Sequence, residues 1–143
     1  MADKQQTIEV YNSFFAVARQ LKKLAHQSAA NLGLTVHQIG ILNSIRTDPG
    51  LTQKEVTERL IFAKSRVSLH IDALVEKGLA TREASELDRR ETKLYLTADG
   101  DKLCLRYNEE AYSHKVLEIA LQRFSKEELD SLVAMHKQIL AQL

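Results

Sequence analysis

Apolar residues recur at three- and four-residue steps from near Thr7 to Ala25. This spacing places them along one face of an α-helix. Asn31-Leu32-Gly33 is typical of a helix end, because glycine readily takes the left-handed conformation found there. The pattern predicts a first helix of about 24 residues, which would span about 36 Å.

Shorter elements follow, separated by turn residues. A helix is expected near 36–46, and Asp48-Pro49-Gly50 is a strong turn signal. Thr52 and Glu55 form a capping box, in which each side chain satisfies a free backbone N–H at a helix start. A short helix is therefore expected through Val56 to Leu60.

A further helix is predicted from about Lys64 to Lys77, after the connection Ile61-Phe62-Ala63. Gly78 is its expected stop. At about 100° per residue, one side of this helix is apolar and is expected to face the core. That side holds Val67, Ile71, Leu74 and Val75.

The hydrophobic period then changes to that of two short strands, at 79–83 and 92–96. The polar loop 84–91 joins them, which predicts a hairpin with a charged tip. Thr97 is the expected N-cap of another long helix, which continues to Leu121.

A second capping box, Ser125 with Glu128, opens a last helix that carries an apolar stripe to Leu143. Helices at both ends of the chain thus have apolar stripes, and a chain of this size has little else to cover them. We therefore expect a homodimer.

The element order predicts a mainly α fold with a small β-hairpin wing. The central segment 35–97 is expected to be a winged helix-turn-helix DNA-binding lobe. The segments 1–34 and 98–143 are expected to supply the N-terminal and C-terminal dimerisation helices.

Charge adds little to this picture, because the net charge of the 143 residues is only +1. The basic excess of many nucleic-acid-binding proteins is missing, so a DNA-binding face must arise from the placement of charge. A cytoplasmic location is expected for two reasons. The N-terminus has no secretory pattern, and Cys104, the single cysteine, excludes an internal disulfide.

Several motifs together resemble the MarR family. They are Leu34-Thr35 with Ile41-Leu42, Leu51-Thr52-Gln53-Lys54-Glu55, the run from Ile71 to Leu79, Asp88-Arg89-Arg90, and Leu96-Thr97-Ala98-Asp99-Gly100. The resemblance covers essentially the whole chain. It implies a triangular homodimer that represses transcription from an inverted-repeat operator in double-stranded DNA. It also implies release by a small phenolic or anionic effector, or by oxidation of a cysteine.

The helix from Lys64 is the candidate recognition helix, which reads base edges with residues near its N-terminal end. The candidates are Lys64, Ser65, Arg66, Ser68, Leu69 and His70. Arg66 suits a bidentate contact with guanine, and Leu69 suits a thymine methyl group. The sequence departs from the usual family pattern at Ile61, Ala63, Ser68 and Leu69. The alternative is a solvated helix face with no DNA contact.

The hairpin tip is the second candidate site. An arginine there, Arg89 or Arg90, suits a narrow, electronegative minor groove. Asp88 is expected to aim an arginine through paired hydrogen bonds. The alternative is a surface salt bridge of little energetic consequence.

The helix that precedes the recognition helix begins with residues suited to phosphate groups, namely Thr52, Gln53 and Lys54. For Thr52, a role in capping alone is the alternative. Candidate effector contacts are residues that offer hydrogen bonds or positive charge between the dimer helices and the lobe: Tyr11, Arg19, Lys22, His26 and His37.

Cys104 is the one candidate for redox regulation. It lies between two leucines, so we expect a buried, inert thiol. The five histidines show no metal-binding spacing, and we expect neither a metal nor a cofactor. Motifs of phosphate loops and catalytic nucleophiles are missing, so an enzyme is not expected. A winged-helix protein–protein adaptor and a redox regulator acting through Cys104 stay open as alternatives.

Overall fold

The structure is a computed structural model that describes residues 1–60 and 64–143. The elements are α1 (Lys4–Asn31), α2 (Val36–Thr47), β1 (Leu51–Thr52), α3 (Gln53–Leu60), α4 (Lys64–Glu76), β2 (Ala80–Ala84), β3 (Thr92–Leu96), α5 (Ala98–Glu110), α6 (Tyr112–Leu121) and α7 (Lys126–Gln142). The predicted mainly α fold with a small wing is confirmed. The connection predicted at Ile61-Phe62-Ala63 lies outside the described residues.

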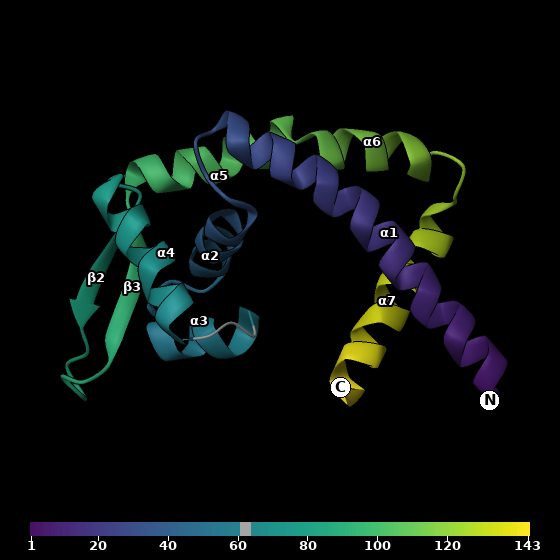
Figure 1. Cartoon of the computed structure of the whole chain (residues 1–143), viewed down its shortest axis with the longest axis horizontal. Helices are drawn as coiled ribbons and strands as arrows, with labels where there is room; N and C mark the ends of the chain where they lie inside the picture. Colours follow the sequence, from purple (N-terminus) through teal and green to yellow (C-terminus); the bar gives the residue numbers. More distant parts are fainter. Residues whose placement is uncertain (61–63) are drawn as a thin grey trace.

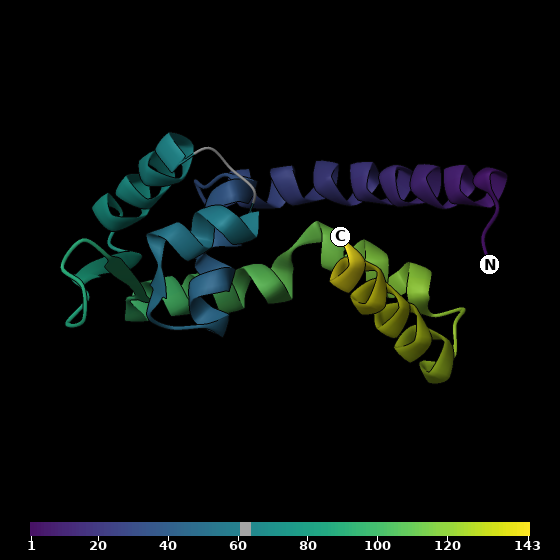
Figure 2. The same cartoon turned by 90° about the horizontal axis from the view of Figure 1, so that it is seen from below.

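Helix α1 begins at Lys4, earlier than the apolar pattern predicted. Asp3 is its N-cap and accepts a hydrogen bond from the Gln6 backbone N–H at 2.8 Å. Gln6 in turn accepts one from the Asp3 N–H at 3.3 Å, which completes a capping box. The apolar period could not mark this polar first turn. Helix α1 extends away from the lobe as one long rod (Figures 1 and 2).

Helices α2 to α5, the end of α1 and the sheet enclose one hydrophobic core, which defines the lobe. Its largest fully buried side chains are Ile41, Leu42, Ile45, Ile71, Leu74, Leu94, Val56, Val67 and Cys104. The apolar side of α4 faces this core as predicted, except at Val75, which is 36% exposed. Val75 is at the edge of the apolar side, about 80° around the helix from Val67.

The sheet has three antiparallel strands in the order β1-β3-β2. Strands β2 and β3 form the predicted hairpin, with Ala80 opposite Leu96 and Ala84 opposite Thr92. The sequence pattern missed β1, where Leu51 pairs with Leu94. A strand of two residues is too short to show the alternating pattern of a longer strand.

The long helix predicted from Thr97 to Leu121 is broken into α5 and α6 at Ala111, where the prediction was wrong. Ala111 has φ −60° and ψ 130°, an extended conformation, and is buried. The N–H of the next residue, Tyr112, donates to the Ser28 hydroxyl oxygen of α1 at 2.9 Å. Ser28 is distant in the sequence, and its hydroxyl satisfies the backbone N–H that has no helical partner at the break. After the break, α6 packs against α1.

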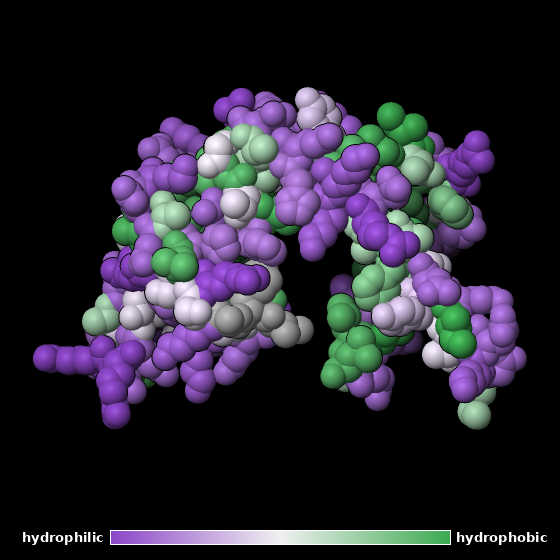
Figure 3. All heavy atoms as spheres, viewed as in Figure 1, coloured by the Kyte–Doolittle hydropathy of each residue, from purple (hydrophilic) through white to green (hydrophobic). Residues whose placement is uncertain are grey.

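The two arms differ from the lobe in their surface. The N-terminal half of α1 and all of α7 have no buried residue, yet they carry many large apolar side chains. The exposed set on α1, α6 and α7 includes Ile8, Tyr11, Phe14, Phe15, Val17, Val116, Ile119, Leu132, Val133, Met135, Ile139 and Leu140. Hydrophobic patches gather over α6 and α7 in Figure 3. Within the described ranges, no helix is both long and apolar enough to span a membrane.

Candidate nucleic-acid interface

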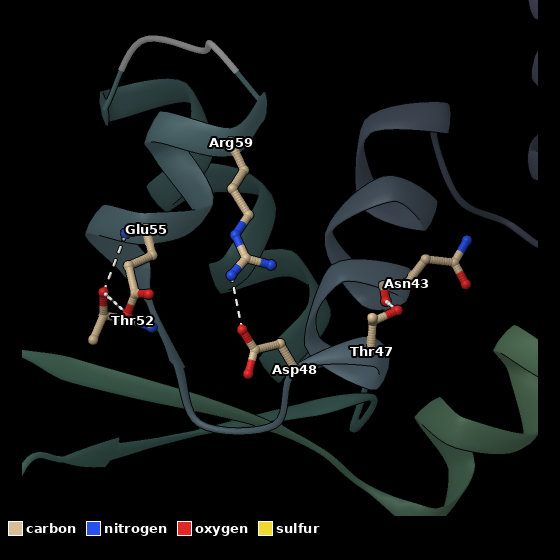
Figure 4. Close-up of polar contacts among 6 residues, drawn as sticks. All are labelled: Asn43, Thr47, Asp48, Thr52, Glu55 and Arg59. Atoms are coloured by element: carbon tan, nitrogen blue, oxygen red, sulfur yellow. Dashed lines mark hydrogen bonds and ion pairs between the residues drawn. The ribbon is translucent and has the colours of Figure 1, made fainter. Parts of the chain in front are cut away.

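Helix α3 begins at the predicted capping box (Figure 4). The Thr52 hydroxyl oxygen accepts from the Glu55 N–H at 3.1 Å, and the Glu55 carboxylate accepts from the Thr52 N–H at 3.2 Å. The Thr52 hydroxyl also donates to the same carboxylate at 2.9 Å. Both functions of the Thr52 hydroxyl are thus used within the protein, which favours the capping role over a phosphate contact. The adjacent Lys54 is exposed.

An ion pair ties α3 to the turn that precedes it. The Arg59 guanidinium lies 2.7 Å from the Asp48 carboxylate, as Figure 4 shows. Close by, the Thr47 hydroxyl donates to the Asn43 carbonyl at 2.9 Å, inside the last turn of α2. The ion pair thus links the C-terminal end of α3 to the turn after α2, whereas the Thr47 hydrogen bond lies within α2 itself.

The candidate recognition helix is α4. Its first residues, Lys64, Ser65 and Arg66, are exposed, and Leu69 is 69% exposed. The remaining candidates, Ser68 and His70, are half-buried. The predicted reading face of α4 therefore lies on the surface of the lobe.

Two contacts hold α4 against its neighbours. The Arg82 guanidinium of β2 lies 2.6 Å from the Asp72 carboxylate of α4, which links the wing to the helix. Just after the C-terminal end of α4, the Lys77 ammonium donates to the Gly33 carbonyl at 3.0 Å. The wing, α4 and the end of α1 are thus joined by polar contacts as well as by the core.

At the wing tip, Asp88 shapes the loop more than it aims an arginine. Its carboxylate accepts from the Arg90 backbone N–H at 2.9 Å. The Arg90 side chain makes one Nε–Oδ1 contact of 3.5 Å with Asp88, in place of the paired hydrogen bonds we expected. Arg90 follows Asp88 by only two residues in the same turn, and this short separation does not let its guanidinium group form two parallel hydrogen bonds with the carboxylate. The Arg90 side chain is 93% exposed, and Arg89 is exposed as well.

One groove of about 470 Å³ joins the start of α3, the start of α4 and the wing. It is lined by five predicted residues: Thr52 of β1, Gln53 and Lys54 of α3, Lys64 of α4 and Arg90 of the wing. Sequence reasoning missed four other lining residues, Thr57, Glu58, Glu91 and Thr92. Thr57 had a detectable signal, because it is four residues after Gln53 and therefore on the same helix face.

The effector candidates fall into two groups. The first group lies in what we call the basic cluster: Lys22 and His26 of α1, His37 of α2, and Arg66 and His70 of α4. The rings of His37 and His70 are 5.5 Å apart, and Gln38 Nε2 lies 3.5 Å from His70 Nδ1. Burial lowers the pKa of His37, and the positive neighbours lower it further. The contribution of α4 to this cluster was not anticipated.

Tyr11 and Arg19 lie further along α1. Tyr11 packs on Phe15, with ring centroids 4.7 Å apart, and is 11 residues before Lys22. That separation is about 16 Å along a helix, so Tyr11 is remote from the basic cluster. Arg19 is exposed, about one turn before Lys22.

Cys104 is 1% exposed, so the prediction of a buried thiol is confirmed. Burial raises the pKa of the Cys104 thiol to about 11, while Arg46 lowers it and Asp101 raises it. The thiol is therefore protonated near neutral pH and unreactive as a nucleophile. Across residues 1–60 and 64–143, His, Cys, Asp and Glu side chains form no group that suits a metal ion.

Comparison with known proteins gives one consistent result. The model of the MarR family matches residues 32–91. The HTH-type transcriptional repressor MdtR of Bacillus subtilis is 28% identical over 128 residues, which cover 90% of this chain and 80% of that protein. Because such relatives are transcriptional regulators, the prediction that the chain is not an enzyme is confirmed.

Solved structures agree with the fold described above. The transcriptional regulator BldR from Sulfolobus solfataricus superposes with a TM-score of 0.85 at 20% identity, over 100% of both chains. A mutant MarR from E. coli, complexed with operator DNA, superposes with a TM-score of 0.76 at 21% identity. That match covers 97% of this chain and 99% of the E. coli chain. In its fold, in the matched segment 32–91 and in its relatives, this chain is similar to the MarR family of winged helix-turn-helix transcriptional regulators.

Proposed function

We propose that this protein is a homodimeric repressor that binds an inverted-repeat operator and leaves it when a small anionic effector binds. The observation that carries the DNA-binding part is the groove shared by α3, α4 and the wing. Helix α4 enters the major groove, while the wing reaches the adjacent minor groove. The protein acts in the cytoplasm, on double-stranded DNA.

In this proposal the exposed residues divide by role. Arg66, Ser65, Ser68 and Leu69 meet base edges, because they lie near the N-terminal end of α4. Backbone phosphates are met by residues at the rim of the groove, namely Gln53, Lys54 and Lys64, with Thr52 contributing mainly as a cap. Arg90, and more weakly Arg89, enters the minor groove.

The exposed apolar faces of α1, α6 and α7 support the homodimer. Large apolar side chains at such density are rare on the surface of a monomer. A second copy would cover them, and the segments 1–34 and 98–143 are the proposed dimerisation helices flanking the lobe 35–97. The end of α1 and much of α5 also contribute to the lobe core. Two lobes in one dimer would contact half-sites about 10 bp apart.

The basic cluster supports an anionic effector. Its members come from α1, α2 and α4, and the positive charges of Lys22, His26, Arg66 and His70 act on His37. A carboxylate there would be attracted to these cations. Since Arg66 belongs both to the cluster and to the reading face, an anion that engages it would compete with DNA. Release of the operator follows directly from this competition.

The DNA-binding proposal is tested by gel shifts against the promoter region of the protein's own gene, across a salt titration. Arg90→Ala should weaken binding about tenfold and reduce the salt dependence by about one ion. Arg106→Ala is the matched control, because Arg106 is another exposed arginine in an ion pair, on α5, 3.1 Å from Glu110. Equal binding by wild type and Arg90→Ala would favour the protein–protein adaptor instead.

The effector proposal is tested separately. Benzoate should displace the operator from the wild type, whereas benzyl alcohol, which has a similar size and no charge, should not. Lys22→Ala should weaken the response to benzoate while leaving DNA affinity nearly unchanged, because Lys22 lies on α1 and not on the reading face. A benzoate response that survives both Lys22→Ala and His37→Gln would contradict the assignment of the site. Sedimentation at micromolar concentration tests the dimer, and a stable monomer would refute it.

A further inference from the structure

Leu87 is the most prominent apolar residue of the wing. Its side chain is 95% exposed, and it lies between the acidic residues Glu86 and Asp88. The loop that carries it projects beyond the helices of the lobe (Figures 1 and 2). A single exposed leucine is common on protein surfaces, so exposure alone assigns no role.

The backbone of this loop is held in place, and the contacts come from both of its sides. The Ser85 hydroxyl oxygen accepts from the Leu87 and Asp88 N–H groups at 3.3 and 3.4 Å. The Asp88 carbonyl accepts from the Glu91 N–H at 3.0 Å, and the Glu91 carbonyl accepts from the Ser85 N–H, also at 3.0 Å. Ser85 itself is only 3% exposed. With the loop fixed in this way, Leu87 is buried only when something outside the chain covers it.

We infer that Leu87 is an apolar wedge that enters the minor groove beside Arg90 and loosens the base step beneath it. The inference rests on the proposed function, in which the wing reaches that groove. Minor-groove proteins often combine a cationic side chain with an apolar one that partly unstacks a step. Leu87 and Arg90 are three residues apart at the same tip, and both are almost fully exposed. The favoured DNA is a flexible pyrimidine–purine step next to a narrow A·T segment.

A protein partner suits this residue less well than DNA. A stable protein interface buries about 800 Å² on each side, which one leucine among charged neighbours does not supply. The extended apolar faces of the chain are elsewhere, on α1, α6 and α7. The minor groove, in contrast, offers sugar carbons and base edges to a single narrow side chain.

The test compares two substitutions of nearly equal size, Leu87→Met and Leu87→Gln. Both variants should melt like the wild type, because Leu87 makes no contribution to the core. Leu87→Gln should lose about 10- to 100-fold in operator affinity, the range expected when the burial of a leucine side chain is lost. Leu87→Met should stay within about twofold of wild type, since methionine is apolar and adaptable. The salt dependence should be unchanged in both, because no phosphate contact is removed.

A second measurement reports on the base step itself. With 2-aminopurine placed at the step beneath the wing, wild type and Leu87→Met should raise its fluorescence, and Leu87→Gln should not. Equal affinities for Met and Gln, or equal fluorescence, overturns the wedge. Arg90→Ala separates this failure from failure of the proposed function. If Arg90→Ala weakens operator binding while Leu87→Gln does not, only the wedge is wrong. If neither variant changes operator affinity, the wing does not contact DNA.

Discussion

Gly100 stands where the wing meets the first helix of the C-terminal arm, and replacing it with alanine should destabilise the protein. The residue is buried in the first turn of α5, and a Cβ there would overlap the Leu79 carbonyl oxygen. That carbonyl accepts from the Thr97 N–H at 3.1 Å, and the Thr97 hydroxyl donates to the Gly78 carbonyl at 2.6 Å. Backbone cannot rotate away like a flexible side chain, so the junction must shift.

The expected loss combines two opposing effects. Overpacking of a filled site costs about 1–3 kcal/mol. Alanine at a helix position recovers up to about 1 kcal/mol relative to glycine. The net change for Gly100→Ala is therefore a loss of about 1–2 kcal/mol, which lowers the melting temperature by about 3–6 °C in a chain of this length.

Gly40→Ala is the matched control. Gly40 lies in the middle of α2, and a Cβ there would meet nothing within 4 Å. Here only the helix preference acts, so stability should rise by about 0.5–1 kcal/mol. Thermal and urea unfolding of both variants, at equal protein concentration, measures the two changes. If Gly100→Ala is as stable as Gly40→Ala, the close approach of Gly100 to the Leu79 carbonyl does not determine the stability of this junction.

Three further predictions follow from the contacts described above. A double-mutant cycle on Arg82 and Asp72 should give a coupling energy of about 0.5–1 kcal/mol that shrinks with salt, and a coupling near zero would show that this ion pair does not hold the wing to α4. His37 has a lowered pKa in the folded protein, so its unfolded form binds protons first as the pH falls below 6.5. Stability should therefore decrease with falling pH in that range, and His37→Gln should flatten the decrease in pH-dependent urea unfolding, whereas an unchanged slope would exclude His37 as its source. Iodoacetamide should label Cys104 in guanidinium and hardly at all in the native protein at pH 8, and rapid native labelling would reopen the redox alternative.

Much of the lobe was predictable because its signals are local. Glycine and proline mark the turns, the capping boxes mark helix starts, and the change from helical to alternating period marks the wing. The reading face of α4 followed from the same periodicity, since burial of Val67, Ile71 and Leu74 leaves the opposite side exposed. Composition gave no guide to the DNA-binding site, because basic and acidic residues nearly cancel.

The corrections share a different origin, which is contact between distant segments. Helix α5 ends at Glu110, and Ser28, far away in the sequence, accepts the Tyr112 N–H that the break leaves without a helical partner. The sequence has no proline or glycine at that break. Likewise, the meeting of His37 with His70 depends on how α2 packs against α4, and no pattern along either helix records it.

The sequence by itself thus determined the order and type of most elements, apart from β1 and the break between α5 and α6, and the motif at the wing tip, because hydrophobic period, capping and turn residues act over a few positions. Only the tertiary structure decided which side chains share a surface. It joined Gln53, Lys64 and Arg90 in one groove and brought Arg66 to the basic cluster, because packing of separate elements sets those distances. It also left Leu87 exposed on a loop whose backbone is held by Ser85 and Glu91.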